Sequence, residues 1–486
     1  CFFKAGETWR IKGTGPFPAA NPHANKFRWI HYVDTGQAQW WIGAGLAGCA
    51  VTDGTNVYDI TPTAWIAPQQ GTNVQVGDLN TIPFINHPEV GPFYWDLNPV
   101  AIAQPLPGWP VNQRAGVMRA HKNFLIAGNI DTAVGLLENE VHWSVSAVPG
   151  DIPATWVPAP TNDAGDMSFA VPGGPILDLL SIRDQVFVSK SNYTGAMQYT
   201  GGQYVFQRRD VFPNIGIFAT GAQVEYGGVV YMLSGAIELI RHDGNAPQNL
   251  SLGSYQDYIR KAINMEFPAS VFLYRDQDEG QIVIAYPAGA TDACTEGLAY
   301  EGATGDICPR DLPNVYSVGV GLTAITPSTW DPDLEAWDLD NTSWNEAMSG
   351  FLPAHICYGT ADGMVEEGQG DGLWVGGASQ PIAAFCERTN LDFGEWGRTK
   401  IFMDFWPIAD GAIDGLMTYK FGTADTANDP VTWSYQQELP VNDSGKQDLD
   451  AFGLNGRLMA YGFASNGGGA WRSCCVKILA RLGGKV

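Results

Sequence analysis

The sequence predicts an all-β protein, and three observations lead to this prediction. First, its 486 residues include 58 Gly and 31 Pro, which supply the turns that many short strands need. Second, 17 Trp, 18 Tyr and 22 Phe favour pleated, half-buried surfaces. Third, only 16% of the residues are charged, and Lys- and Glu-rich helical stretches are missing. The length is ample for more than one domain.

Short apolar runs joined by Gly-, Asn- or Asp-rich turns recur along the chain. Residues 49–52 and 57–60 flank Asp53 and Gly54, and Asp-Gly between apolar runs is a strong hairpin signal. The same plan predicts further paired strands at 119–127 with 141–146, 182–189 with 196–199, 229–234 with 237–241, and 272–275 with 281–286. The best helix candidate is 255–265, which is apolar on one face.

Hairpins repeated at this spacing indicate a sandwich, a barrel or a propeller. Since a four-stranded blade takes ~40–50 residues, eight blades would use roughly 360 and leave roughly a hundred over. We therefore predict a β-propeller of divergent four-stranded blades, with loop insertions and an additional C-terminal β unit. The propeller-like body is expected at 1–395, with inserted loops near 287–311 and 360–379. The C-terminal unit, 396–486, either stands apart or completes the propeller.

The formal charge of −24, from 27 basic and 51 acidic residues, argues against specific nucleic-acid recognition. Duplex DNA carries about one negative charge per ~1.7 Å of its axis and would be repelled. The charge either keeps the protein soluble or lines a channel through which DNA slides without sticking. No apolar run reaches the ~18 residues of a membrane span, and no signal peptide is visible. The sequence starts at Cys1, which leaves room for a missing leader.

Eight cysteines over this length show no framework spacing, so we expect thiols made in a reducing cytoplasm. Cys474 and Cys475 are adjacent, which disfavours an ordinary disulfide between them. Cys294 and Cys308 flank one predicted loop and are the only pair that merits a test.

Residues 43–48 match the G-x-G-x-x-G dinucleotide fingerprint, but residues 49–54 read as a strand and a turn. The fingerprint needs a helix at that point, so we expect a glycine-rich β-turn. Four aspartates lie close together but lack the mid-loop Gly of an EF-hand, so we expect solvated turns rather than a Ca²⁺ site. They are Asp331, Asp333, Asp338 and Asp340.

Two further sets of residues are candidates for a zinc site and for a sugar-binding surface. His355, Cys357 and Cys386 could hold zinc if the fold joins them, but they also fit ordinary strands. Aromatic faces stack on sugars or dock loops on a β surface, and three tryptophans recur every seven residues: Trp330, Trp337 and Trp344. Asp429 to Trp433 resembles only the tail of a sialidase Asp-box. We assign no catalytic, cofactor-binding or metal residue, and we expect neither a cofactor nor an enzymatic activity.

Several phrases, in order, resemble the tail nozzle proteins of short-tailed bacteriophages, also called packaged-DNA stabilisation or tail tubular proteins. They lie at 43–48 with 57–62, 119–127, 141–144, 152–156, 174–180, 185–189, 197–199, 227–244, 310–315, 431–434, 456–458, 461–464 and 471–472. Residues 310–315, R-D-L-P-N-V, form one of the most specific phrases. The chain departs from the family pattern at His121, at 307–309 and at Gly462, where an Arg is usual.

The resemblance implies a structural virion protein. Six copies would form a ring at the tail nozzle or neck, in contact with the portal-adaptor side and the tail fibres. The bore would continue the DNA channel, and the ring would help to retain and then release the genome. The protein would be assembled in the host bacterial cytoplasm and reside in the virion tail.

Two alternatives from other functional classes stay open, because propellers host many functions. One is a glycan-binding or glycan-hydrolysing propeller of a phage tail. A hydrolase would need a pair of working carboxylates, and the sequence offers too many candidates to choose one. The other is a tail fibre or receptor-binding module.

Overall fold

The computed structural model describes residues 2–4, 7–17, 24–201, 205–323, 354–368, 372–411, 416–441, 445–449, 453–466 and 471–485. Strands dominate this part of the chain. Its one α-helix is α1 (Tyr255–Ala262), close to the predicted helix at 255–265, and two 3₁₀ turns are η1 (Ala24–Lys26) and η2 (Pro268–Ser270). No helix among the described residues is long and apolar enough to cross a membrane.

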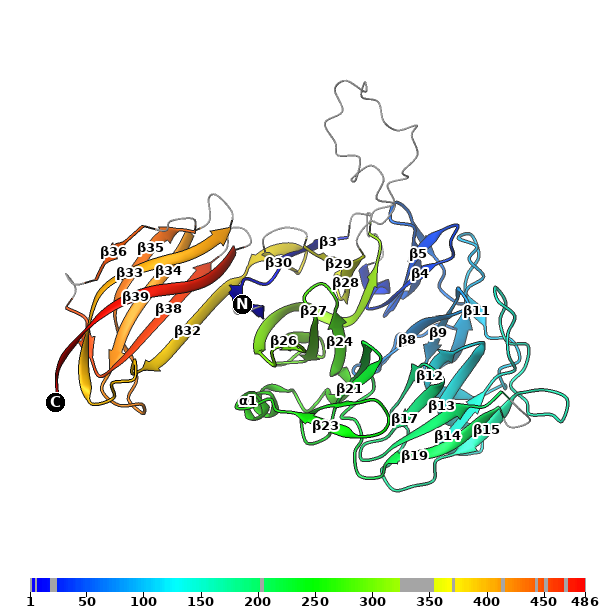
Figure 1. Ribbon diagram of the computed structural model, residues 1–486. Coiled ribbons are helices and arrows are strands. Elements are labelled where there is room, and N and C mark those ends of the chain that lie inside the picture. The colour runs from blue at the N-terminus through cyan, green and yellow to red at the C-terminus, as the bar shows by residue number, and fades with distance from the viewer. Residues whose placement is uncertain are drawn as a thin grey trace, which may run out of the picture.

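Five four-stranded antiparallel sheets follow one another along the chain, each with its strands in sequence order (Figure 1). They are β4 (Trp29–Asp34), β5 (Gln39–Gly45), β6 (Gly48–Thr52) and β7 (Val57–Asp59); β8 (Gln75–Leu79), β9 (Ile82–His87), β10 (Gly91–Tyr94) and β11 (Gln104–Pro105); β12 (Arg114–His121), β13 (Phe124–Thr132), β14 (Gly135–Trp143) and β15 (Gly165–Ser168); β16 (Asp178–Ile182), β17 (Gln185–Ser189), β18 (Thr194–Tyr199) and β19 (Phe206–Phe212); β20 (Gln223–Tyr226), β21 (Val229–Leu233), β22 (Leu239–His242) and β23 (Pro247–Leu250).

A seven-stranded sheet comes next and supplies two more blades. Its order is β24 (Phe272–Asp276), β25 (Gln281–Tyr286), β26 (Cys294–Glu301), β27 (Ile307–Gly321), β28 (His355–Thr360), β29 (Gly363–Glu367) and β3 (Thr14–Pro16). The long strand β27 changes partner near its middle, because its register with β26 ends at Val315 and its register with β28 runs from Val315 to Gly321. It is therefore the outer strand of one blade and the inner strand of the next.

The first strands of the blades form a closed ring. β4 contacts β8, β8 contacts β12, and the series continues through β16, β20 and β24, while β27 contacts β4. Between β24 and β27, Phe272 and Tyr274 share one buried hydrophobic cluster with Val315. Strand β3, from the start of the chain, completes the last blade by pairing with β29, so that Thr14 lies opposite Glu367. The described residues thus form a seven-bladed propeller, and the predicted β-propeller is confirmed. Blades are longer than the eight-blade estimate assumed, because connections such as 144–164 are long.

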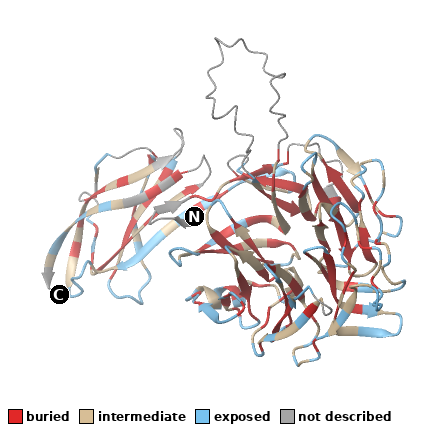
Figure 2. Ribbon diagram, turned by 45° about the vertical axis from the view of Figure 1, so that its right-hand side comes forward, coloured by how far each residue is buried: buried red, intermediate tan, exposed pale blue. Residues whose placement is uncertain are grey.

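The burial pattern explains why these strands read as apolar runs rather than as alternating patterns. In β25 every residue is buried, and in β5 all but the first are. Such strands have a neighbouring blade on each face, so both sets of side chains leave water. Figure 2 shows the buried residues concentrated inside the blades and exposed residues at the outer loops.

Two further sheets form a β-sandwich beside the propeller (Figure 1). One has the order β32 (Ala383–Leu391), β38 (Leu458–Asn466), β34 (Leu416–Ala424) and β35 (Thr432–Pro440). The other has the order β1 (Phe2–Lys4), β2 (Glu7–Trp9), β39 (Trp471–Lys485), β33 (Arg398–Gly411) and β36 (Gln447–Asp448), with β37 (Asn455–Gly456) also on β33. Buried aromatic residues, including Phe402, Phe405, Tyr419 and Phe421, form the core between the sheets.

The sandwich is a unit of its own and takes no strand from the propeller. Its strand β32 begins at Ala383, inside the predicted body 1–395. A hairpin of β30 (Gly372–Val375) and β31 (Ala378–Pro381) precedes it, and Trp374 N donates to Thr14 Oγ1 at 2.8 Å. The sandwich is therefore connected to the propeller by two segments of the chain. One runs from β2 to β3, and the other runs from β31 to β32.

The two stretches expected as inserted loops contain strands. Residues 287–311 include β26 and the start of β27, and residues 360–379 include β29 and β30. Two of their glycines lie where another part of the chain approaches closely. A Cβ on Gly372 would lie 2.4 Å from Gln380 O, and one on Gly297 would lie 3.1 Å from Val283 Cγ1. Glycine-rich composition was therefore misleading at these positions.

Candidate functional site

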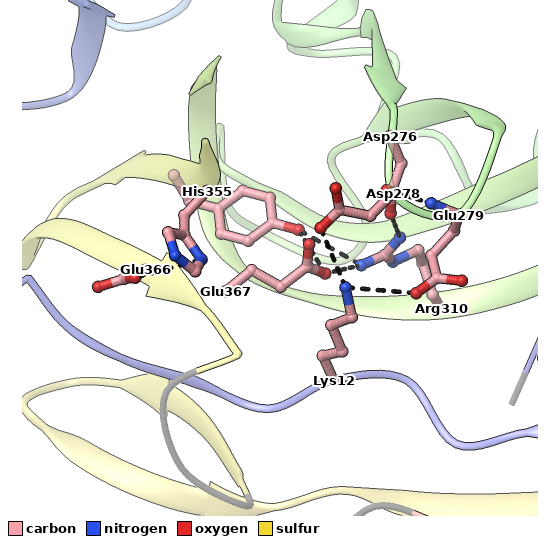
Figure 3. Close-up of polar contacts among 9 residues, drawn as sticks. Lys12, Asp276, Asp278, Glu279, Arg310, His355, Glu366 and Glu367 are labelled. Atoms are coloured by element: carbon pink, nitrogen blue, oxygen red, sulfur yellow. Dashed lines mark hydrogen bonds and ion pairs between the residues drawn. The ribbon is translucent and has the colours of Figure 1, made fainter. Parts of the chain in front are cut away.

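A buried cluster of charges lies where the propeller ring closes (Figure 3). The Arg310 guanidinium places Nη2 2.6 Å from Glu367 Oε1 and Nη1 3.4 Å from Asp276 Oδ2. Nη2 also donates to Tyr358 Oη at 3.3 Å, and Tyr358 Oη donates to Glu367 Oε1 at 3.1 Å. Side-chain exposure is only 7% for Arg310, 5% for Glu367 and 1% for Asp276.

Each member of this closing cluster comes from a different strand. Asp276 ends β24, Arg310 lies on β27, and Glu367 ends β29 beside β3. Lys12, just before β3, reaches over the cluster with its Nζ 3.2 Å from Asp278 Oδ2 and 3.3 Å from Glu279 Oε1. The cluster therefore ties the sixth blade, the seventh blade and the start of the chain together.

The electrostatics of the closing cluster suit a clamp rather than a proton-transfer site. Burial lowers the pKa of Arg310, but Tyr274, Tyr358 and the two carboxylates more than reverse this, and the pKa lies well above its ordinary value. Burial raises the pKa of Glu367. The Arg310 charge lowers this pKa, but the net pKa stays above its ordinary value. Because its pKa is raised and both acids hold it, the guanidinium keeps all its protons and does not act as a general acid. Buried ion pairs of this kind are demanding in geometry and can fix strand register.

The neighbouring residue Glu366 faces a separate polar group. Its Oε1 accepts from Thr323 Oγ1 at 2.8 Å and lies 3.5 Å from His355 Nδ1 (Figure 3). Its Oε2 is buried and has no partner in the described part of the chain. His355 and Cys357 lie on β28, whereas Cys386 lies on β32 of the sandwich. Within the described residues no three His, Cys, Asp or Glu side chains are grouped to hold a metal ion.

The inner strands line an open cavity of about 390 Å³ at the propeller axis. Its polar wall includes the pair His31–Asp78, with Nε2 2.8 Å from Oδ1, which joins β4 to β8. It also includes Arg119, whose Nη2 lies 2.9 Å from Asp178 Oδ1 and joins β12 to β16. Burial would raise the pKa of Asp78, but the hydrogen bond and charge of His31 bring it below its ordinary value. These ion pairs therefore connect neighbouring blades.

The glycine-rich motif at 43–48 is a strand, a turn and a strand, as expected. Gly45 ends β5 and Gly48 begins β6 with φ +128°, so no helix starts there. A Cβ on Gly45 would lie 2.0 Å from Asn25 O. The glycines therefore allow η1 to pack on the hairpin, and the motif has no phosphate-binding geometry.

Other sequence candidates are separated or lie outside the described residues. Cys294 and Cys308 form no disulfide, because the strand register sets them opposite Val315 and Ala299. Asp429 caps a turn by accepting from Thr426 N at 3.0 Å. The segment 324–353 lies outside the described residues and carries Trp330, Asp331, Asp333, Trp337, Asp338, Asp340 and Trp344.

The closing cluster itself could not be found by motif searching. Its members are spread from Lys12 to Glu367, and no spacing rule joins them. The only signal was the phrase 310–315, which the family resemblance singled out and which contains Arg310.

Comparisons with known proteins add no family. No protein-family model matches the sequence, and no curated protein matches it either. Among solved structures, the extracellular domain of a hybrid two-component system from B. thetaiotaomicron is 11% identical with a TM-score of 0.40, and the match covers 85% of this chain but 45% of that one. BamB from Moraxella catarrhalis is 9% identical with a TM-score of 0.40, covering 75% and 92% of the two chains. BBS1N in complex with ARL6DN is 10% identical with a TM-score of 0.41, covering 74% and 96%. At these scores the likenesses support no inference about function.

Proposed function

We propose that this chain is a structural protein of a phage tail, in which six copies form a ring at the nozzle or neck and continue the DNA channel. The observation that carries the proposal is the order of the family-like phrases along nearly the whole sequence. One of them, 119–127, spans the hairpin of β12 and β13, and another, 310–315, holds the buried Arg310. The resemblance thus runs through the strands that build the blades.

The DNA channel of this proposal lies between copies and not along the propeller axis. The axial cavity of about 390 Å³ has the size of a small-ligand pocket. A duplex whose major groove alone is ~12 Å wide does not fit it. The formal charge of −24 supports a bore that repels phosphates, so that DNA passes without sticking.

The first experiment measures how many copies of the purified chain assemble and in what shape. Native mass spectrometry and class averages of negatively stained particles should give six copies in a ring with an open bore. Duplex DNA should show no binding at physiological salt, because the chain is strongly acidic. A stable trimer of elongated shape would favour a fibre, and a chain that stays monomeric at all concentrations would overturn the ring.

The second experiment locates the protein in the virion. The tip of the hairpin between β13 and β14 is a suitable epitope, since Val134 is 98% exposed. Gold-labelled antibody against this tip should mark the axial end or the neck of the tail. Label on lateral appendages would overturn the proposal.

A further inference from the structure

A second cavity, also of about 390 Å³, opens beside the propeller axis where connections between blades gather. Its wall combines residues of the first, sixth and seventh blades with connections between blades. Arg28 and Trp29 lie at the start of β4, Tyr316 lies on β27, and Asp292 lies between β25 and β26. The connection from β7 to β8 supplies one wall with Gln69, Gln70, Thr72 and Asn73. We call this the Arg28 pocket.

Arg28 is a cation that no carboxylate neutralises. Its guanidinium carbon lies 4.4 Å from the centroid of the Tyr316 ring, and no Asp or Glu of the described chain forms an ion pair with it. Its Nε is buried and has no hydrogen-bond partner among the described residues. In a chain with 51 acidic residues, this guanidinium lacks the strong charge-assisted hydrogen bonds that a carboxylate would supply.

The neighbouring groups hold the arginine in place without neutralising it. Tyr316 Oη donates to Asp292 Oδ1 at 2.9 Å, and the Trp29 and Tyr316 rings meet edge to face at 6.2 Å. Burial raises the pKa of Tyr316 to about 12; the Arg28 charge lowers this pKa and Asp292 raises it. The phenol therefore keeps its proton and its hydrogen bond. The Asp292 carboxylate is thereby engaged, although its charge remains in the pocket.

The opposite wall offers neutral hydrogen-bonding groups on a fixed loop. The Glu89 carboxylate accepts from Thr72 Oγ1 at 2.7 Å and from Gln69 N at 3.3 Å, which fixes the loop at both ends. Gln70 and Asn73 also line the cavity. An unpaired guanidinium, aromatic rings and carboxamides in one small cavity suit a ligand that carries both a carboxylate and hydroxyl groups.

We propose that the Arg28 pocket binds a single carboxylated sugar unit, with the carboxylate on Arg28 and the hydroxyls on the carboxamides of the opposite wall. The proposal does not depend on ring assembly, because every lining residue belongs to one chain.

The test is a titration of the full chain with glucuronate by calorimetry, with glucose and acetate as the neutral and the carboxylate-only probes. Glucuronate should bind about tenfold or more tightly than either probe, which is the scale of one charge-assisted hydrogen bond. A uronate trisaccharide runs alongside. Tighter binding of the trisaccharide supports the end of a polymer as the source, and equal binding supports the free acid. No binding of glucuronate to the wild type overturns the proposal.

Two substitutions with opposite expected effects separate binding from damage to the fold. Arg28→Met keeps an apolar stem over Tyr316 and should weaken glucuronate binding about tenfold or more. Asp292→Asn keeps an acceptor for Tyr316 and removes a repelling charge, so it should strengthen binding. Arg241→Met is the matched control, since Arg241 lies 5.9 Å over the Tyr231 ring, outside the pocket. Unchanged binding in Arg28→Met, or weaker binding in Asp292→Asn, would overturn the proposal.

Discussion

The propeller and the sandwich both join chain segments that are far apart in the sequence, but they do so with different side chains. In the propeller, β3 meets β29 beside the buried ion pairs of Arg310 with Asp276 and Glu367. In the sandwich, β2 meets β39 over a core of aromatic rings, in which Phe405 lies 4.7 Å from Phe421.

This difference has consequences for how each unit tolerates change. A buried ion pair needs one geometry, and the loss of one partner leaves an uncompensated charge. An aromatic core depends on volume and shape, and related apolar side chains repack at modest cost. Substitutions at the propeller closure should therefore cause a large loss of unfolding free energy. Substitutions between apolar residues in the sandwich core should cause a small one.

Arg310→Met should give the largest effect, because it leaves Asp276 and Glu367 buried without their cation. We expect a loss of about 3–5 kcal/mol of unfolding free energy in the propeller. Urea denaturation, followed by peptide-resolved hydrogen exchange, should show opening at β3 and β29 first. Lys12→Met is the control and should cost under about 1 kcal/mol, since Lys12 is 36% exposed. Equal losses in the two variants would contradict the clamp.

Acidification should separate the two units next. Burial lowers the pKa of both His121 and His242 to about 4. Unfolded histidine titrates near 6.5, so between pH ~6.5 and ~4 the unfolded state binds more protons, and stability falls as the pH falls. We expect roughly 1–3 kcal/mol for each histidine by pH ~4.

The sandwich supplies the internal control for this pH dependence. All seven histidines lie at or before His355, so the strands from Ala383 onward contain none. Hydrogen exchange at several pH values, corrected for its intrinsic pH dependence, should show destabilisation confined to the propeller. His242→Gln should reduce the slope. A sandwich that weakens in parallel over this window would contradict the comparison.

Phe405→Leu tests the tolerance of the sandwich core. Phe405 is fully buried, with ring centroids of Tyr419 and Tyr435 at 5.6 and 6.1 Å. We expect a loss of about 1–2 kcal/mol, limited to the sandwich, because Leu refills most of the volume. Denaturant unfolding of the whole chain, read at peptides of β33 and β34, measures it. A loss as large as that of Arg310→Met would remove the distinction between the units.

Gly462→Ala should give the smallest effect and concerns the outer face of the sandwich. Lys420 reaches across Gly462 to pair with Glu387, and its Nζ lies 4.2 Å from the Trp433 ring centroid. A Cβ at 462 would lie 2.9 Å from Lys420 Cε and would displace it. Because the pair is partly exposed, the change should stay within about 1 kcal/mol. A larger loss in thermal unfolding would show that surface charges matter here as much as in the propeller.

The sequence was most informative where the structure is local. Hairpins such as β24–β25 were predicted from turn residues, because a few adjacent residues decide a turn. The pairing of Thr14 with Glu367, and of Thr8 with Ser473, left no local signal, because antiparallel edges accept many partners. For the same reason the sequence does not predict that Arg310 contacts Asp276. Arg28 carries no sequence signal either, because its distinguishing feature is the lack of a carboxylate partner among the described residues.

The pairing of β3 with β29 also sets an order of events during synthesis. Thr14 is synthesised before Glu367 and finds its partner strand only when Glu367 has left the ribosome. At ~5–20 residues per second, this wait is roughly 20–70 s. During that time six blades can stack one after another while the ring stays open and its edges stay unpaired. The propeller of the nascent chain therefore closes late, when β3 pairs with β29.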